Sequence, residues 1–277
     1  MLSGLCFGFL GYFGKLAFAK GVSPFELLSL RFLLSGSLMV LGLFIFTRRM
    51  RAFPKSRIPT ALLMGIFGYA IFSSCYFLAV QGLSASMAVL LLYTYPLFVV
   101  LGTFFLQPNV MSKQKLLLVF LTLGGIVLLI GGDFQVHRWT SFAIGLASGI
   151  TYAIFILGSA NWLKGADALV SSSLIQLGSG AALFGFGFQS MEDVSKVWQL
   201  ASVEVLGLAV VCSIIPITLF QLGVQKLKEW EVSILSTTEP IMALFVSGYF
   251  LGDKLNPVQF IGGAILIFAM LATSLLR

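Results

Sequence analysis

A glutamate followed directly by a proline stands inside an apolar stretch near the end of the sequence. Glu239 and Pro240 lie in a run whose other members are almost all apolar or small. An ionised side chain at bilayer depth costs about 2.5–3.5 kcal/mol even on lenient insertion scales, so it is normally kept for a function. A carboxylate can bind a cation or carry a proton, and the proline removes a backbone hydrogen bond beside it. Glu239 is therefore a candidate substrate-binding or proton-coupling group.

Two further ionisable residues lie deep within apolar stretches, Lys15 and Arg31. Intramembrane charges usually face the interior of a helix bundle and pair with one another. Two cations and one anion suit a zwitterion, whose carboxylate would meet Lys15 or Arg31 and whose amino group would meet Glu239. The alternative for Arg31 is an ion pair that only holds helices together. Lys15 lies close enough to the end of its stretch to extend to the membrane interface.

Four tyrosines within apolar stretches are candidate lining residues of a substrate pathway. They are Tyr76, Tyr93, Tyr95 and Tyr152. A tyrosine combines an apolar ring with a hydroxyl group, which suits small organic metabolites. The serines and threonines near them are instead expected to form hydrogen bonds between helices.

The composition defines the elements that must position these residues. Hydrophobic residues make up 58% of the chain and charged residues 10%, and the mean hydropathy is +1.02. About 20 apolar residues cross a bilayer as a helix, and runs of that length repeat along the chain. We predict an all-α integral membrane protein with about ten transmembrane helices, at 2–19, 25–47, 58–79, 84–106, 115–131, 141–160, 168–189, 202–223, 231–251 and 257–276.

The residues of common catalytic and metal sites are scarce in this sequence. It contains one histidine, His137, and three scattered cysteines, and it lacks a zinc-protease motif, a serine nucleophile elbow and a nucleotide-binding loop. We therefore predict no enzymatic activity, no cofactor and no metal site. The net charge of +7 reflects the placement of basic residues beside the membrane, so no nucleic-acid partner is expected.

The basic residues predict the orientation of the chain in the membrane. The loop 48–57 carries five of them, and cytoplasmic loops are where lysine and arginine accumulate. Placing this loop inside puts both termini inside, with eleven basic residues in cytoplasmic segments and four outside. We predict a multi-pass protein of the inner (plasma) membrane with cytoplasmic termini.

The two halves of the sequence resemble each other. A shift of 144 positions brings Leu78–Leu83 onto Leu222–Leu227 and Pro96 onto Pro240. Because both prolines interrupt apolar spans, we predict helix breaks at Pro96 and Pro240. Internal repeats of this kind are typical of transporter folds.

Each half contains five predicted spans, at residues 1–136 and 137–277. An odd number of spans makes the second half enter the membrane in the opposite direction. The loop after the seventh span carries Glu192 and Asp193 in place of the basic residues found after the second span. The chain is therefore predicted to form two inverted five-helix repeats.

Several short motifs closely resemble the EamA-type family of the drug/metabolite transporter superfamily, and the resemblance covers essentially the whole chain. The motifs are Ser236–Pro240, Gly252–Leu255 and Gly262–Ala264 in the second repeat, and Phe7–Gly8, Lys15, Ser23–Pro24 and Leu30–Phe32 in the first. Two positions differ from the family pattern. Phe7 stands where tryptophan is usual, and Asp253 replaces a glutamate.

The resemblance implies a secondary transporter with a central cavity between its repeats, often an exporter of amino acids or other small metabolites. We expect a monomer that moves a zwitterionic or amphipathic small molecule by alternating access, with a proton as the candidate coupling ion through Glu239. The inverted repeat and the paired prolines favour a carrier. The alternative is a channel or a non-transporting membrane partner protein.

Overall fold

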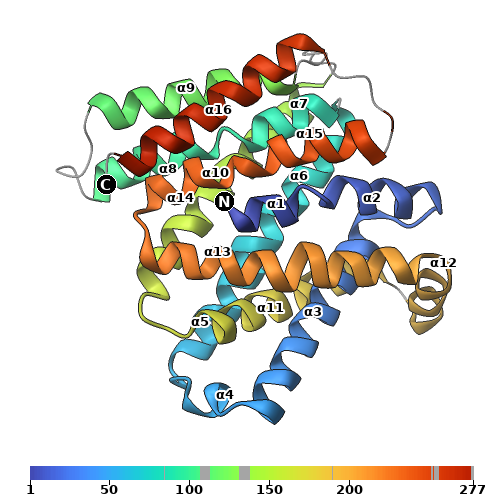
Figure 1. Cartoon of the computed structure of the whole chain (residues 1–277). Coiled ribbons are helices and arrows are strands. Elements are labelled where there is room, and N and C mark those ends of the chain that lie inside the picture. The colour runs from blue at the N-terminus through green and yellow to red at the C-terminus, as the bar shows by residue number, and fades with distance from the viewer. Residues whose placement is uncertain are drawn as a thin grey trace.

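The computed structural model describes residues 1–83, 85–106, 113–130, 138–188, 190–250, 252 and 256–275. In these ranges the chain is almost entirely helical and contains no β-strand. His137 and Asp253 lie outside the described residues. Figure 1 shows the helices as a bundle in which α9 and α16 lie side by side along one edge, and these two helices also pack against each other.

Helices occupy all five predicted spans of the first half. In chain order they are α1 (Leu2–Phe7), α2 (Leu10–Ala19), α3 (Pro24–Phe46), the short α4 (Arg49–Ala52), α5 (Arg57–Leu63), the π-helix η1 (Met64–Tyr69), α6 (Ala70–Gly82), α7 (Ala85–Leu92), α8 (Tyr95–Leu106) and α9 (Lys113–Ile130).

The second half has a similar order. Its helices are α10 (Trp139–Trp162), α11 (Ala168–Gly187), α12 (Met191–Ala209), the π-helix η3 (Val210–Ile214), α13 (Ile215–Lys226), α14 (Glu229–Ser236), α15 (Thr238–Phe250) and α16 (Pro257–Leu275). It differs in that α10 is continuous where α1 and α2 are separate, and in that α4 has no counterpart within the described residues. Among the residues described, eight helical segments are long and apolar enough to cross a membrane, and Pro257–Thr273 is a shorter apolar helix. The prediction of an all-helical membrane protein with about ten spans is confirmed.

The eighth span differs from its prediction at one end. We expected it to begin at residue 202, but α12 begins at Met191, where Ser190 and Asp193 form a capping box. The backbone of Ala201 leaves the helical region (φ −138°, ψ 30°), so the added turns are set off by a kink. These first turns carry charged residues, and a search for apolar runs does not detect them.

The starts of α3 and α11 follow from their first residues. Ser23 accepts a hydrogen bond from the backbone N–H of Glu26, whose carboxylate accepts one from Ser23 N, and Pro24 takes the first helical position. At the equivalent place in the second half, 144 residues later, the Asp167 carboxylate caps α11 by accepting from the N–H groups of Leu169 and Val170.

The crossing of α3 and α11 shows how the two halves are related. Gly36 of α3 lies on Leu177, where an added methyl group would be 2.6 Å from the Leu177 nitrogen. Gly180 of α11 lies in the same way on Leu33, at 2.5 Å from its nitrogen. The shift of 144 converts one contact into the other. Such a reciprocal pair is produced by a two-fold axis between the repeats, as inverted repeats require.

The irregular parts of the helices recur with nearly the same spacing. The π-helix η1 within the third span has its counterpart in η3 within the eighth. The break at Tyr93–Thr94 between α7 and α8 has its counterpart at Thr237 between α14 and α15. Features that interrupt regular hydrogen bonding are often found at functional sites, and these four lie in the interior of their spans.

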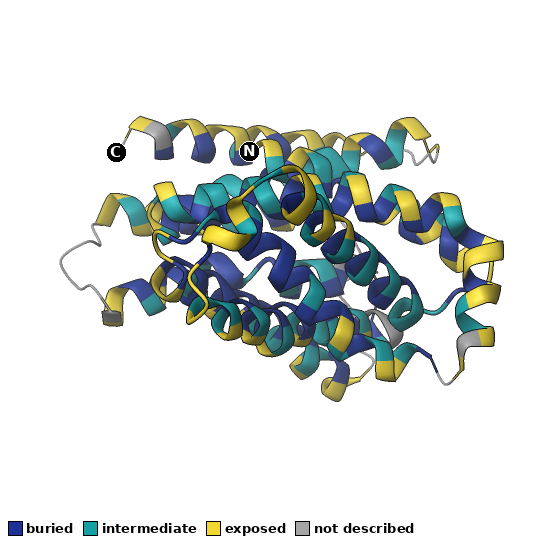
Figure 2. Cartoon of the chain, turned by 90° about the horizontal axis from the view of Figure 1, so that it is seen from below, coloured by how far each residue is buried: buried dark blue, intermediate teal, exposed yellow. Residues whose placement is uncertain are grey.

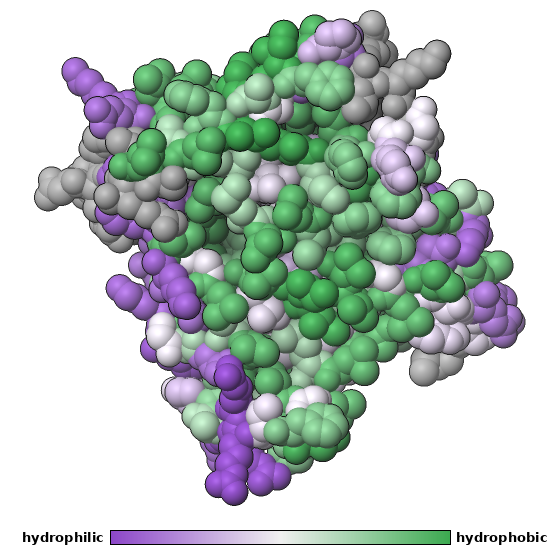
Figure 3. All heavy atoms as spheres, in the orientation of Figure 1, coloured by the Kyte–Doolittle hydropathy of each residue, from purple (hydrophilic) through white to green (hydrophobic). Residues whose placement is uncertain are grey.

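The surface fits a membrane environment. Figure 3 shows hydrophobic side chains across the middle of one face, with hydrophilic groups gathered towards its edges. Large apolar side chains are exposed on many helices, including Phe46, Phe105 and Leu275. In Figure 2 the buried positions of each helix face the interior of the bundle and the exposed ones face outwards. Lipid is the solvent that such a surface requires.

Candidate functional site

A cavity of about 460 Å³ lies between α2, α3, α6 and α15. Six of the seven predicted pathway residues line it: Lys15, Arg31, Tyr76, Tyr93, Tyr152 and Glu239. They are far apart in the sequence and come from both halves of the chain. The walls are otherwise mostly apolar, which is typical of small-molecule sites with a few placed polar groups.

Glu239 is positioned by the break that precedes it. The chain turns at Thr237 and restarts as a helix at Thr238, so Glu239 lies in the first turn of α15. The positive end of a helix dipole favours a carboxylate at that position. Tyr93 lines the same cavity as Glu239. The carboxylate is half-buried and faces the cavity.

Arg31 supplies the opposite charge from α3. Its side chain is only 3% exposed, and its guanidinium carbon lies 4.4 Å from the centre of the Phe32 ring. Tyr69 lines the same cavity, and its ring lies 5.3 Å from that of Phe32. Arg31 and Glu239 are close enough to attract each other, but no direct ion pair joins them. Two opposite charges therefore face one cavity without neutralising each other by contact.

Lys15 and Tyr76 line the cavity from different helices. Lys15 on α2 is exposed. Tyr76 on α6 is half-buried, and its ring packs edge-on against Phe77 at 5.2 Å.

Tyr152 lines the cavity as part of an aromatic layer. Its ring stacks on Phe155 and on Phe220, both at 6.2 Å between centroids, and it contacts Phe72 at 4.4 Å. Tyr95 lies behind this layer, outside the cavity lining. Its hydroxyl donates to the backbone oxygen of Ser233 at 3.0 Å, and its ring lies 4.7 Å from Tyr152.

The helix breaks lie just before the two prolines. Pro96 and Pro240 occupy the first turns of α8 and α15, where a missing backbone N–H is tolerated. The hydroxyl groups of Thr94 and Thr238 donate to carbonyls three residues earlier, those of Leu91 at 2.6 Å and Leu235 at 2.7 Å. These threonines are also 144 residues apart, so both breaks are built in the same way.

A glycine from the other half of the chain packs on each break. A methyl group on Gly149 of α10 would lie 3.1 Å from the Leu92 carbonyl oxygen. One on Gly4 of α1 would lie 3.2 Å from the Ser236 carbonyl oxygen. Leu92 and Ser236 each precede a proline by four residues, so their carbonyls lack the usual helical donor. Only a residue without a side chain allows the neighbouring helix this close to them.

The sequence did not identify every polar or aromatic lining residue. Tyr12, Phe72 and Gln259 also line the cavity. Phe72 could have been found, because it completes an i, i+3, i+7 pattern with Tyr69 and Tyr76. Tyr12 precedes Lys15 by three residues, which places the two on one helical face. Gln259 carries no such pattern and is identified only by its position in the fold.

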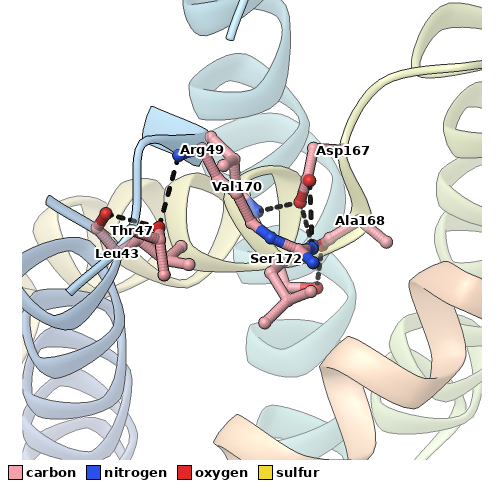
Figure 4. A network of polar contacts seen from close by, with 8 residues as sticks. Leu43, Thr47, Arg49, Asp167, Ala168, Val170 and Ser172 are labelled. Carbon is pink, nitrogen blue, oxygen red and sulfur yellow. Dashed lines mark hydrogen bonds and ion pairs between the residues drawn. The ribbon is translucent and has the colours of Figure 1, made fainter. Parts of the chain in front are cut away.

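Polar contacts join the two halves around the start of α11. Arg49 donates to the Asp167 carboxylate at 3.2 Å, while Asp167 also caps α11. Figure 4 shows this network, with Ser172 one turn into α11. Nearby, the Arg57 guanidinium donates to the Lys164 carbonyl at 2.5 Å. These contacts tie α4 and α5 of the first half to the start of α11.

The apolar helices, the reciprocal packing of two halves and a central cavity lined by both define a multi-pass membrane protein of the inverted-repeat transporter class. The family model of EamA-like transporters matches residues 1–131 and 139–275. The chain belongs to the EamA-like transporter family, as its motifs indicated. A solved crystal structure that is 20% identical has the same fold, with a TM-score of 0.81 over 99% of this chain and 94% of that chain.

Two relatives illustrate the family. An uncharacterized transporter of Archaeoglobus fulgidus is 30% identical over 213 residues, which are 76% of this chain and 75% of the relative. The threonine/homoserine exporter RhtA of Escherichia coli is 26% identical over 210 residues, which are 73% of this chain and 67% of the relative.

Proposed function

We propose that this protein is a secondary-active exporter of small zwitterionic metabolites such as amino acids. The observation that carries the proposal is the pairing of Arg31 and Glu239 across one cavity without a direct ion pair. A substrate carboxylate would bind at Arg31, with Lys15 near the entrance, and an amino group would bind at Glu239. The cavity volume falls in the range of about 300–1,000 Å³ that is usual for small-molecule sites.

The tyrosines would complete the site. Tyr76, Tyr93 and Tyr152 offer ring faces to the apolar part of a substrate and hydroxyl groups to its polar part. Tyr95 would act from behind by holding the aromatic layer against α14. The similarity to a threonine/homoserine exporter supports an amino acid as substrate, and transporters among the relatives support a role other than that of an enzyme.

Proton coupling through Glu239 is part of the proposal. A carboxylate whose neighbours change between two conformations also changes its proton affinity. Substrate binding between Arg31 and Glu239 would change the groups around the carboxylate. The binding of substrate and the binding of a proton at Glu239 would therefore depend on each other. This linkage is what a proton-driven carrier needs.

The orientation proposed from the charge pattern places the cavity mouth outside the cell. With cytoplasmic termini, α2, α6 and α15 form the outer halves of their spans. The structure would then represent an outward-open state of a monomer in the plasma membrane. Its two repeats, 1–136 and 137–277, would exchange roles when the protein turns inward.

The test uses proteoliposomes to which threonine, homoserine or a mixture of amino acids is added on the outside. We expect the unmodified protein to move at least one of them along an imposed pH gradient. Glu239→Gln should abolish the pH-driven accumulation and retain slow exchange. Glu192→Gln, which removes a carboxylate from the exposed first turn of α12, serves as the control and should transport normally.

Two results would overturn the proposal. If Glu239→Gln transports with the pH dependence of the unmodified protein, Glu239 does not couple protons. If the purified protein instead gives single-channel currents in planar bilayers, the chain is a channel and not a carrier.

A further inference from the structure

A group of polar side chains is buried between helices in the half of the bundle that the cavity does not reach. Ser159, Ser172, Gln176 and Gln221 are all fully buried. Gln221 Nε2 donates to Ser159 Oγ at 3.5 Å. Ser172 Oγ donates to the Ala168 carbonyl at 2.7 Å and also lies 3.3 Å from the Ile217 carbonyl oxygen. The side-chain oxygens of Gln176 and Gln221 have no hydrogen-bond donor within the described chain. Leaving such groups unpaired is unfavourable, which suggests that they have partners in another state.

The first pair of this group lies on helices whose counterparts face the open cavity. Phe77 corresponds to Gln221 at the offset of 144. Gly4 and Gly149, which pack on the equivalent breaks, are 145 residues apart, so Lys15 corresponds to Ala160, the neighbour of Ser159. Lys15 on α2 and Phe77 on α6 both line the cavity, whereas Ser159 on α10 and Gln221 on α13 contact each other. The same pair of helices is thus open in one half and closed in the other.

A second pair follows the same rule. Adding 144 to Leu28 and Ser73 gives Ser172 and Ile217. Leu28 on α3 and Ser73 on α6 both line the cavity, whereas Ser172 on α11 contacts Ile217 on α13. The open cleft that α2 and α3 form with α6 therefore has a closed counterpart, in which α10 and α11 pack directly on α13.

An aromatic layer connects the cavity lining to α13. Tyr152, which lines the cavity, stacks on Phe155 and Phe220, and these two rings also stack on each other at 6.2 Å. Phe220 belongs to α13, next to Gln221. A movement of α13 away from α10 would remove Phe220 from this layer and expose the buried polar group beneath it.

We infer that the interface of α10 and α11 with α13 is the cytoplasmic half of the substrate pathway, and that Ser159, Ser172 and Gln221 line it when it opens. This inference rests on the proposed function. An inverted repeat reaches its second state by exchanging the conformations of its halves, so the closed interface takes the form of the open cleft. The hydroxyl and amide groups would then bind water and the polar groups of a zwitterionic substrate on its way from the cytoplasm.

Cysteine accessibility tests this inference without a known substrate. In a background in which Cys6, Cys75 and Cys212 are replaced by alanine, Gln221→Cys and Ser172→Cys are introduced singly. Inside-out vesicles are treated with a membrane-impermeant maleimide. We expect both cysteines to be labelled, because the interface opens to the cytoplasmic side during the transport cycle.

The matched control is Ser173→Cys, one residue from Ser172 and equally buried, whose hydroxyl donates to the Val170 carbonyl. Ser173 shares a helical face with Leu177 and Gly180, which pack against α3. We expect this crossing of α3 and α11 to stay closed during the transport cycle. Labelling of the two pathway cysteines should be at least tenfold faster than labelling of Ser173→Cys. Equal rates at the three positions, or no labelling at Gln221→Cys and Ser172→Cys, would overturn the inference.

A cross-link adds a second measurement in case one variant folds poorly. In the double variant Ser159→Cys and Gln221→Cys, oxidation should join α10 to α13 and stop transport, and reduction should restore it. Transport that continues after complete cross-linking would also overturn the inference. Cytoplasmic labelling without transport of any amino acid would support the pathway and contradict the proposed substrate class. Failure of the pathway inference can therefore be distinguished from failure of the proposed function.

Discussion

The reciprocal crossing of α3 and α11 gives a prediction whose size can be worked out. In Gly36→Ala the new methyl group would lie 2.6 Å from the nitrogen and 2.9 Å from the Cα atom of Leu177, where ordinary contacts are 3.4–4 Å. The opposing atoms are backbone, so the helices themselves must separate by roughly 1 Å, because helix interfaces are closely packed. Overpacking of this kind costs about 1–3 kcal/mol.

A second glycine of the same helix is the matched control. Gly42 has nothing within 4 Å of an added methyl group, so Gly42→Ala should gain up to about 1 kcal/mol from helix propensity. Thermal unfolding in detergent, followed by tryptophan fluorescence, measures the difference. At about 2–4 °C per kcal/mol for a chain of this size, Gly36→Ala should unfold several degrees below Gly42→Ala.

The two-fold relation makes the prediction stricter. Gly180→Ala should lower the unfolding temperature about as much as Gly36→Ala, since both methyl groups enter the same crossing. The double variant should lose less than the sum of the two, because one separation of α3 and α11 relieves both contacts. Equal stability of Gly36→Ala and Gly42→Ala would refute the close crossing, and strictly additive losses would refute a shared one.

Two further predictions concern the topology and the helix breaks. An Arg51→Cys variant should resist impermeant thiol reagents in intact cells, because the loop 48–57 is predicted to be cytoplasmic; rapid labelling would reverse the proposed orientation. Pro96→Ala and Pro240→Ala should each restore a missing backbone donor and stiffen the break, so transport should fall while expression holds. Unchanged transport in both variants would show that Thr94 and Thr238 maintain the breaks without the prolines.

The charged residues of the candidate site could be predicted, because a charged side chain in an apolar span is energetically unfavourable. Glu239 and Arg31 are expensive to place in apolar spans, and that cost makes them stand out among the apolar residues around them. The tyrosines were less certain, because a tyrosine is compatible with either a cavity wall or a packed core. Tyr152 lines the cavity while Tyr95 points at Ser233 behind it. The direction of each ring depends on how its helix is rotated, which its own residue type does not reveal.

The sequence by itself determined the class of this protein. Its apolar runs leave lipid as the only suitable solvent, and the recurrence of Pro96 at Pro240 predicts two related halves. Tertiary structure alone decided which half is open. Lys15 and Phe77 face a cavity, whereas Ser159 and Gln221 on the corresponding helices contact each other. The local pattern of residues is similar in both halves, so the choice depends on contacts between helices distant in the chain.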